Sequence, residues 1–89
     1  MPLIEAIIEL FKRHNLEAIF KDSTFTIIPR NQDSLVNFYE VLKELQSVHR
    51  ARILGHIGNA TLSLEFDMQL GNLMLRFRYV TLLKKDFAT

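Results

Sequence analysis

The sequence predicts a single α+β domain over residues 1–89, in the order helix, two strands, helix, three strands. Three observations predict this class. Apolar residues recur at helical spacing near the N-terminus and again in the middle of the chain. Alternating apolar and polar residues follow each helical stretch. Two Gly-Asn dipeptides then divide the last third into three strands. We expect a five-stranded antiparallel sheet with two helices packed mainly on one face.

The first helix is predicted from Leu3 to about His14, and Asn15 is its expected stop. Its apolar positions cover a wide arc, which is typical of a helix covered on more than one side. The segment LEAIFKDSTFTII then reads as a hairpin with Asp22-Ser23 as its turn. That turn places Phe20 opposite Phe25, and Pro29 ends the second strand.

The second helix is predicted within NQDSLVNFYEVLKELQSVH. Asp33 or Ser34 is expected to cap it, because a side-chain oxygen at that position accepts an N–H of the first turn. Its apolar residues follow helical spacing from Leu35 to His49. The first hairpin can join the sheet beside either the third or the fifth strand, and the pattern leaves both arrangements open.

Gly58-Asn59 and Gly71-Asn72 each suit a two-residue type II′ turn. The second turn pairs the strands as follows: Met68 with Leu75, Asp67 with Arg76, Phe66 with Phe77, Glu65 with Arg78, and Leu64 with Tyr79. The first turn gives Ile53 with Leu64, Arg52 with Glu65, Ala51 with Phe66, and Arg50 with Asp67. Apolar residues then meet apolar residues and acids meet bases, and a slip of one residue would destroy both patterns.

This register predicts two charged rows, Arg52–Glu65–Arg78 and Arg50–Asp67–Arg76, each with one excess positive charge. The mildly basic face is a candidate contact for an anion or a nucleic acid, through Arg50, Arg52, Arg76 and Arg78. However, single-stranded RNA is bound on a sheet by exposed aromatic residues. Here Phe66, Phe77 and Tyr79 alternate to the opposite face, so an ion-pair ladder is the favoured interpretation.

Apolar residues on the charged side of the sheet form the second candidate surface. Its members come from the hairpin and from the last three strands: Ile19, Ile28, Leu54, Met74 and Val80. A solvated face does not need them, so they indicate a subunit or partner interface. Hydrophobic residues make up 48% of the chain, which is generous for a domain that buries about 60–65% of its unfolded surface.

Composition excludes few functions. The net charge of +1 indicates neither nucleic acid nor a membrane, although residues 47–89 are more basic than residues 1–46. No apolar run reaches the length of a membrane span, and there is no signal-peptide pattern. The absence of cysteine excludes disulfides and Cys-based zinc sites, and a cytoplasmic location is the expectation.

The sequence contains no phosphate loop, nucleophile elbow or paired-carboxylate motif, and no two histidines share helical i, i+4 spacing. We therefore expect no catalytic residue, cofactor or metal. The leading hypothesis is a non-enzymatic module that binds a protein partner and forms a homodimer. The alternative is a nucleic-acid-binding accessory protein that uses the four arginines, and third is a small enzyme whose site is not visible in the sequence.

Overall fold

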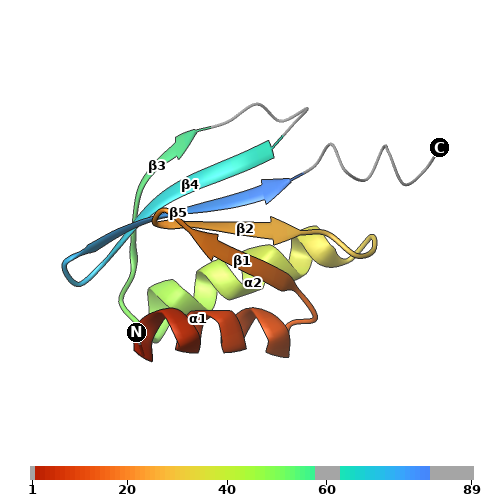
Figure 1. The fold of residues 1–89 in the computed structure, drawn as a ribbon, viewed down its shortest axis with the longest axis horizontal. Helices are drawn as coiled ribbons and strands as arrows, with labels where there is room; N and C mark the ends of the chain where they lie inside the picture. Colours follow the sequence, from red (N-terminus) through yellow and green to blue (C-terminus); the bar gives the residue numbers. More distant parts are fainter. Residues whose placement is uncertain (1, 58–62, 81–89) are drawn as a thin grey trace.

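The computed structural model describes residues 2–57 and 63–80, which form two helices and one five-stranded sheet (Figure 1). The helices are α1 (Pro2–Arg13) and α2 (Ser34–Ser47). The strands are β1 (Glu17–Lys21), β2 (Thr24–Ile28), β3 (Arg52–Ile57), β4 (Ser63–Leu70) and β5 (Leu73–Val80). The predicted α+β class and element order are confirmed.

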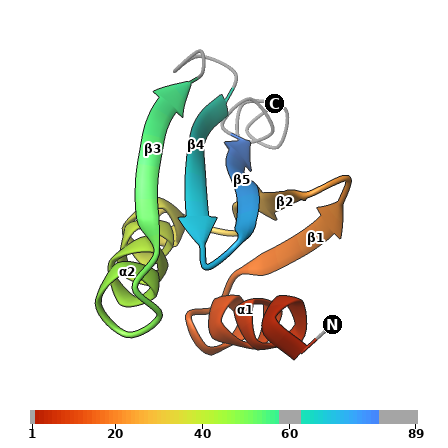
Figure 2. The ribbon, with the colours of Figure 1, turned by 90° about the vertical axis from the view of Figure 1, so that its left-hand side faces the viewer.

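The strand order is β1-β2-β5-β4-β3, so the first hairpin joins beside β5 (Figure 2). β2 and β5 are parallel, with Phe25 beside Phe77, and the expectation of an entirely antiparallel sheet is therefore wrong. The physical reason is the connection through α2. A helix returns the chain to the starting end of the sheet, so β3 runs in the direction of β2. Two hairpin reversals then give β5 that same direction.

Local chemistry explains where α1 ends and where the first hairpin turns. Asn15 has φ +59°, and the N–H groups of Asn15 and Leu16 donate to the carbonyls of Lys12 and Phe11 at 3.0 and 2.9 Å, which is the Schellman pattern. In the hairpin, Asp22 and Ser23 have φ +53° and +59°, as a type I′ turn requires. The predicted Phe20–Phe25 pair is confirmed.

The start of α2 differs from the predicted cap. Asp33 occupies the N-cap position without a side-chain hydrogen bond to the helix. Ser34 is 1% exposed, and its hydroxyl accepts the backbone N–H groups of Arg30 and Asn31 at 2.9 and 3.1 Å. The expectation of a first-turn cap by either residue is wrong, because Ser34 holds the preceding loop instead.

The core lies between the helices and one face of the sheet, here called the inner face, which carries Phe25, Phe66, Phe77 and Tyr79. Phe11 of α1 lies 6.1 Å from both the Phe25 and Phe77 rings, measured between centroids. Phe38 of α2 lies 5.2 Å from Tyr79 and 6.1 Å from Phe66. Aromatic pairs at these distances stabilise beyond their buried area. The rings thus join both helices to β5.

The β4–β5 hairpin has the predicted register throughout, from Leu64–Tyr79 to Met68–Leu75, and Gly71 has the positive φ of +59° that its turn requires. The Phe66–Phe77 pair is therefore confirmed. Phe77 is fully buried, whereas Phe66 is half-buried.

The predicted β3–β4 register is wrong. Arg52 pairs with Gln69 and Ile53 with Met68, and after a bulge at Leu54 the pairs are Gly55–Asp67, His56–Phe66 and Ile57–Glu65. The proposed turn at Gly58-Asn59 lies outside the described residues. The start of β3 is decided by α2 instead, because the N–H of Ala51 donates to the carbonyl of Leu45 at 2.9 Å. This bond holds Ala51 at the helix end, so neither Arg50 nor Ala51 enters the sheet.

Candidate functional site on the outer face of the sheet

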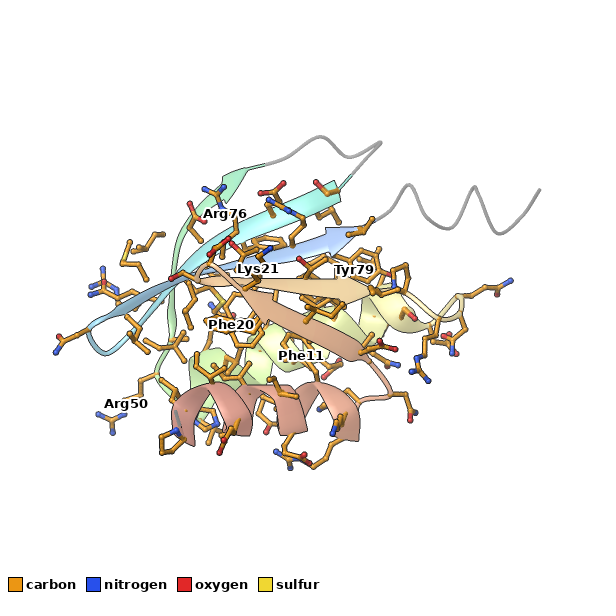
Figure 3. The ribbon with its side chains drawn as sticks, viewed as in Figure 1. Phe11, Phe20, Lys21, Arg50, Arg76 and Tyr79 are labelled. Carbon is orange, nitrogen blue, oxygen red and sulfur yellow. The ribbon has the colours of Figure 1, made fainter. Side chains whose placement is uncertain are left out.

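The face opposite the inner face, here called the outer face, carries the other half of each strand's side chains. On β1 these are Glu17, Ile19 and Lys21, all exposed. On β2, β4 and β5 every outward side chain is half-buried or exposed. Phe11 lies between α1 and the sheet, whereas Arg76 lies on the far side of the sheet from α1 (Figure 3). The outer face is thus the broad surface that neither helix covers.

The centre of the outer face is an ion-pair cluster, here called the ladder: Glu65, Asp67, Arg76 and Arg78. The Arg76 guanidinium binds both carboxylate oxygens of Asp67, with Nε–Oδ1 at 2.8 Å and Nη2–Oδ2 at 3.2 Å. Arg76 Nη1 also lies 3.6 Å from Glu65 Oε1, and Arg78 Nε lies 3.3 Å from Glu65 Oε2. The hydrogen bond from Arg76 holds the pKa of Asp67 below its ordinary value, although partial burial opposes this.

The structure does not bring the four predicted arginines together. Arg76 and Arg78 form the ladder with carboxylates of β4. Arg52 lies opposite Gln69 instead of Glu65, and Arg50 has φ +56° and precedes the strand. The two predicted three-membered rows are therefore wrong, because β3 contributes Ile57 and Gly55 opposite the two acids. The charge of each ladder arginine is largely neutralised within the sheet, which leaves less attraction for a phosphate.

The five predicted apolar interface residues separate into two groups. Thr26 of β2 pairs with Arg78 of β5. Two residues further along these parallel strands, Ile28 and Val80 are therefore neighbours. Ile19 of β1 lies opposite Thr26. These three residues form one apolar corner of the outer face. Met74 precedes Arg76 on β5, so Arg76 and Arg78 separate it from Val80. Leu54 lies at the bulge of β3. Ile19, Leu54 and Met74 are 51%, 44% and 56% exposed.

A shallow depression of about 340 Å³ lies where the β1–β2 turn meets β5. It is lined by the turn and by the adjacent ends of β4 and β5: Asp22, Ser23, Thr24, Asp67, Met74, Leu75 and Arg76. The N–H of Arg76 donates to the Ser23 carbonyl at 3.0 Å, which holds the turn against β5. The guanidinium in this lining, that of Arg76, is already bound to the Asp67 carboxylate.

Sequence reasoning did not single out four other exposed apolar residues, which lie on α2, at its C-terminal end and on β3. Val36, Tyr39 and Val48 of the α2 segment are 60%, 42% and 64% exposed, and Ile53 of β3 is 41% exposed. The i, i+3 spacing of Val36 and Tyr39 on one helix face is the signal that pointed to a shared exposed position.

Histidines and carboxylates of the described residues do not gather as metal ligands do: among residues 2–57 and 63–80, no three of these side chains lie together. His14 instead lies 3.7 Å from Glu44 of α2, which also pairs with Arg13, so these charges connect the two helices. Neither described helix is long and apolar enough to cross a bilayer. Comparison of the chain with protein-family models, with curated proteins and with solved structures finds no match.

Proposed function

We propose that the chain is a non-enzymatic protein–protein interaction module that acts as a homodimer. The observation that supports this most directly is the outer face of the sheet. It lies away from both helices and still carries exposed large apolar residues, Ile19 and Met74, beside a neutralised ion-pair ladder. Isolated surface apolar residues are ordinary, but an apolar corner that continues to a strand edge is typical of an interaction surface.

The charges of the outer face fit a protein partner better than a nucleic acid. Its ladder arginines, Arg76 and Arg78, are bound to Glu65 and Asp67, and the aromatic side chains of β4 and β5 point to the inner face. Stacking on bases requires aromatic rings on the same side as the basic groups. A protein surface requires only complementary charge and apolar area.

Sedimentation velocity between about 1 and about 100 μM tests the proposal, because a dimer with micromolar Kd is largely formed at the upper concentration. We expect a reversible shift from monomer to dimer across this range. A single monomeric species at about 100 μM would refute the homodimer. Nuclease treatment is the control, since a species that disappears with nuclease would contain nucleic acid.

A further inference from the structure

We infer that the dimer forms by antiparallel pairing of β1 with β1 of a second copy, with the two-fold axis at Ile19. This inference deepens the proposed function and rests on it. Strand β1 is one of the two edge strands of the sheet. The edge of β1 that faces away from β2 has no strand partner among the described residues. An unpaired strand edge presents backbone N–H and C=O groups that can pair with another chain.

The backbone of β1 has the right groups on its free edge for this register. Lys21 and Thr24 close a two-residue hairpin, and the closing pair of such a hairpin exchanges hydrogen bonds. Hydrogen bonding alternates along antiparallel strands, so the backbone groups of residues 17, 19 and 21 bond to β2. The N–H and C=O groups of Ala18 and Phe20 point away from β2, at the free edge of the sheet. Placing Ile19 opposite Ile19 of the second copy aligns Ala18 with Phe20 of that copy. The backbone groups of Ala18 and Phe20 then hydrogen-bond to Phe20 and Ala18 of the second copy.

The side chains of β1 are complementary to themselves in this register. On the outer face, Glu17 meets Lys21 of the second copy, and the two-fold axis repeats this pair. Ile19, which is 51% exposed, meets its own copy between the two charge pairs. All three are non-hydrogen-bonded positions, where facing side chains approach most closely. Arg30, which follows β2, donates from Nη2 to Glu17 Oε1 at 2.8 Å, so one carboxylate oxygen is already paired and the second is the acceptor for the incoming lysine.

Other pairings are less favourable. A parallel β1 pair would place Glu17 beside Glu17 and Lys21 beside Lys21, which repel. A shift of the antiparallel register by two residues removes both charge pairs, because Glu17 and Lys21 then no longer face each other. The strand therefore specifies one orientation and one register.

The other edge strand, β3, is less suited to pairing with another chain than β1. A dimer that closes after two copies requires this difference between the two edges. Strand β3 is interrupted by the bulge at Leu54, whereas β1 keeps a regular register with β2 over all five of its residues. A bulge twists an edge and disfavours regular addition of another strand. With one regular edge and one interrupted edge, isologous pairing closes after two copies and does not continue into a filament.

Charge exchange between two variants gives the sharpest test. In Glu17→Lys, both Glu17–Lys21 pairs of the homodimer become lysine against lysine. In Lys21→Glu, both pairs become acid against acid. Each variant alone should dimerise about tenfold or more weakly than the wild type, because two attractive pairs per dimer become repulsive. The equimolar mixture should regain wild-type dimerisation, since opposite charges then meet in both rows. Recovery in the mixture also shows that each variant is folded.

Cross-linking locates the axis. The chain has no cysteine, so Ile19→Cys supplies a single thiol that should form a disulfide with its own copy under mild oxidation. Met74→Cys is the matched control, because Met74 is equally exposed on the outer face but lies on β5. We expect rapid dimer cross-linking for Ile19→Cys and slow cross-linking for Met74→Cys.

A dimer that persists in both charge variants, or that cross-links better at position 74, would refute β1 pairing and leave the homodimer standing. A wild-type chain that stays monomeric at about 100 μM would instead overturn the proposed function itself. Charge variants that stay monomeric when mixed, while the wild type dimerises, would also contradict the Glu17–Lys21 pairing.

Discussion

Replacing Ser34 by alanine should destabilise the domain through two backbone groups that lose their partner. Ser34 is 1% exposed, and its hydroxyl accepts N–H groups from Arg30 and Asn31 at 2.9 and 3.1 Å. A buried donor left without a partner costs about 1–3 kcal/mol. Arg30 and Asn31 are themselves exposed, so water reaches part of the site. We therefore expect a total loss of about 1–3 kcal/mol, not twice that value.

Tyr79→Phe is the comparison variant. Tyr79 is 1% exposed, and its hydroxyl lies close enough to Ser34 to interact with it but makes no hydrogen bond of regular geometry within the described residues. Removing an unsatisfied buried hydroxyl should leave stability unchanged or slightly raise it. Burial raises the pKa of the Tyr79 phenol, and the Ser34 hydroxyl offsets part of this effect. The wild type should therefore lose stability as the pH rises from about 10 toward the raised folded-state pKa, and Tyr79→Phe should lack that loss.

Urea denaturation followed by circular dichroism, at one protein concentration for all variants, measures both effects. Equal concentration matters because dimer formation adds to apparent stability. A change below about 0.5 kcal/mol for Ser34→Ala, which is the range of ordinary surface substitutions, would refute the role of its hydroxyl. A Tyr79→Phe variant that loses as much stability as Ser34→Ala would show that the tyrosine hydroxyl is hydrogen-bonded.

The remaining predictions concern the sheet. Phe77→Ala should cost about 3–5 kcal/mol in urea denaturation, and Phe66→Ala should cost less because Phe66 is only half-buried; equal losses would contradict the different burial. Asp67→Asn should destabilise at neutral pH, and its difference from the wild type should shrink as the pH falls through 3.8, the ordinary pKa, toward the lowered one; a difference independent of pH would contradict this. Arg76→Gln with Arg78→Gln should leave the sedimentation of the dimer unchanged. A micromolar affinity for single-stranded nucleic acid that this double variant lost would favour the alternative function.

Local features of the fold follow from the sequence because their causes lie within a few residues. Asn15 ends α1 since asparagine tolerates the left-handed conformation, and Gly71 opens the β4–β5 turn for the same backbone reason. That turn, together with strict alternation, was enough to give the whole β4–β5 register. The Asp67–Arg76 and Glu65–Arg78 pairs of the ladder could therefore be predicted.

Features that depend on the path of the chain could not be predicted in this way. The β3–β4 register was wrong because a hydrogen bond from Ala51 to the end of α2 and the bulge at Leu54 determine it, and the alternation of residues reveals neither. That single difference removed Arg50 and Arg52 from the ladder.

Strand β1, the candidate dimer strand, depends both on its local sequence and on its place in the tertiary structure. Alternation alone places Glu17, Ile19 and Lys21 on one side of β1, and their order makes the strand complementary to itself. Nothing local says that β1 lies at the edge of the sheet. The tertiary structure decides this, because α2 returns the chain so that β5 adds in parallel to the far side of β2, while β1 pairs with no described strand except β2.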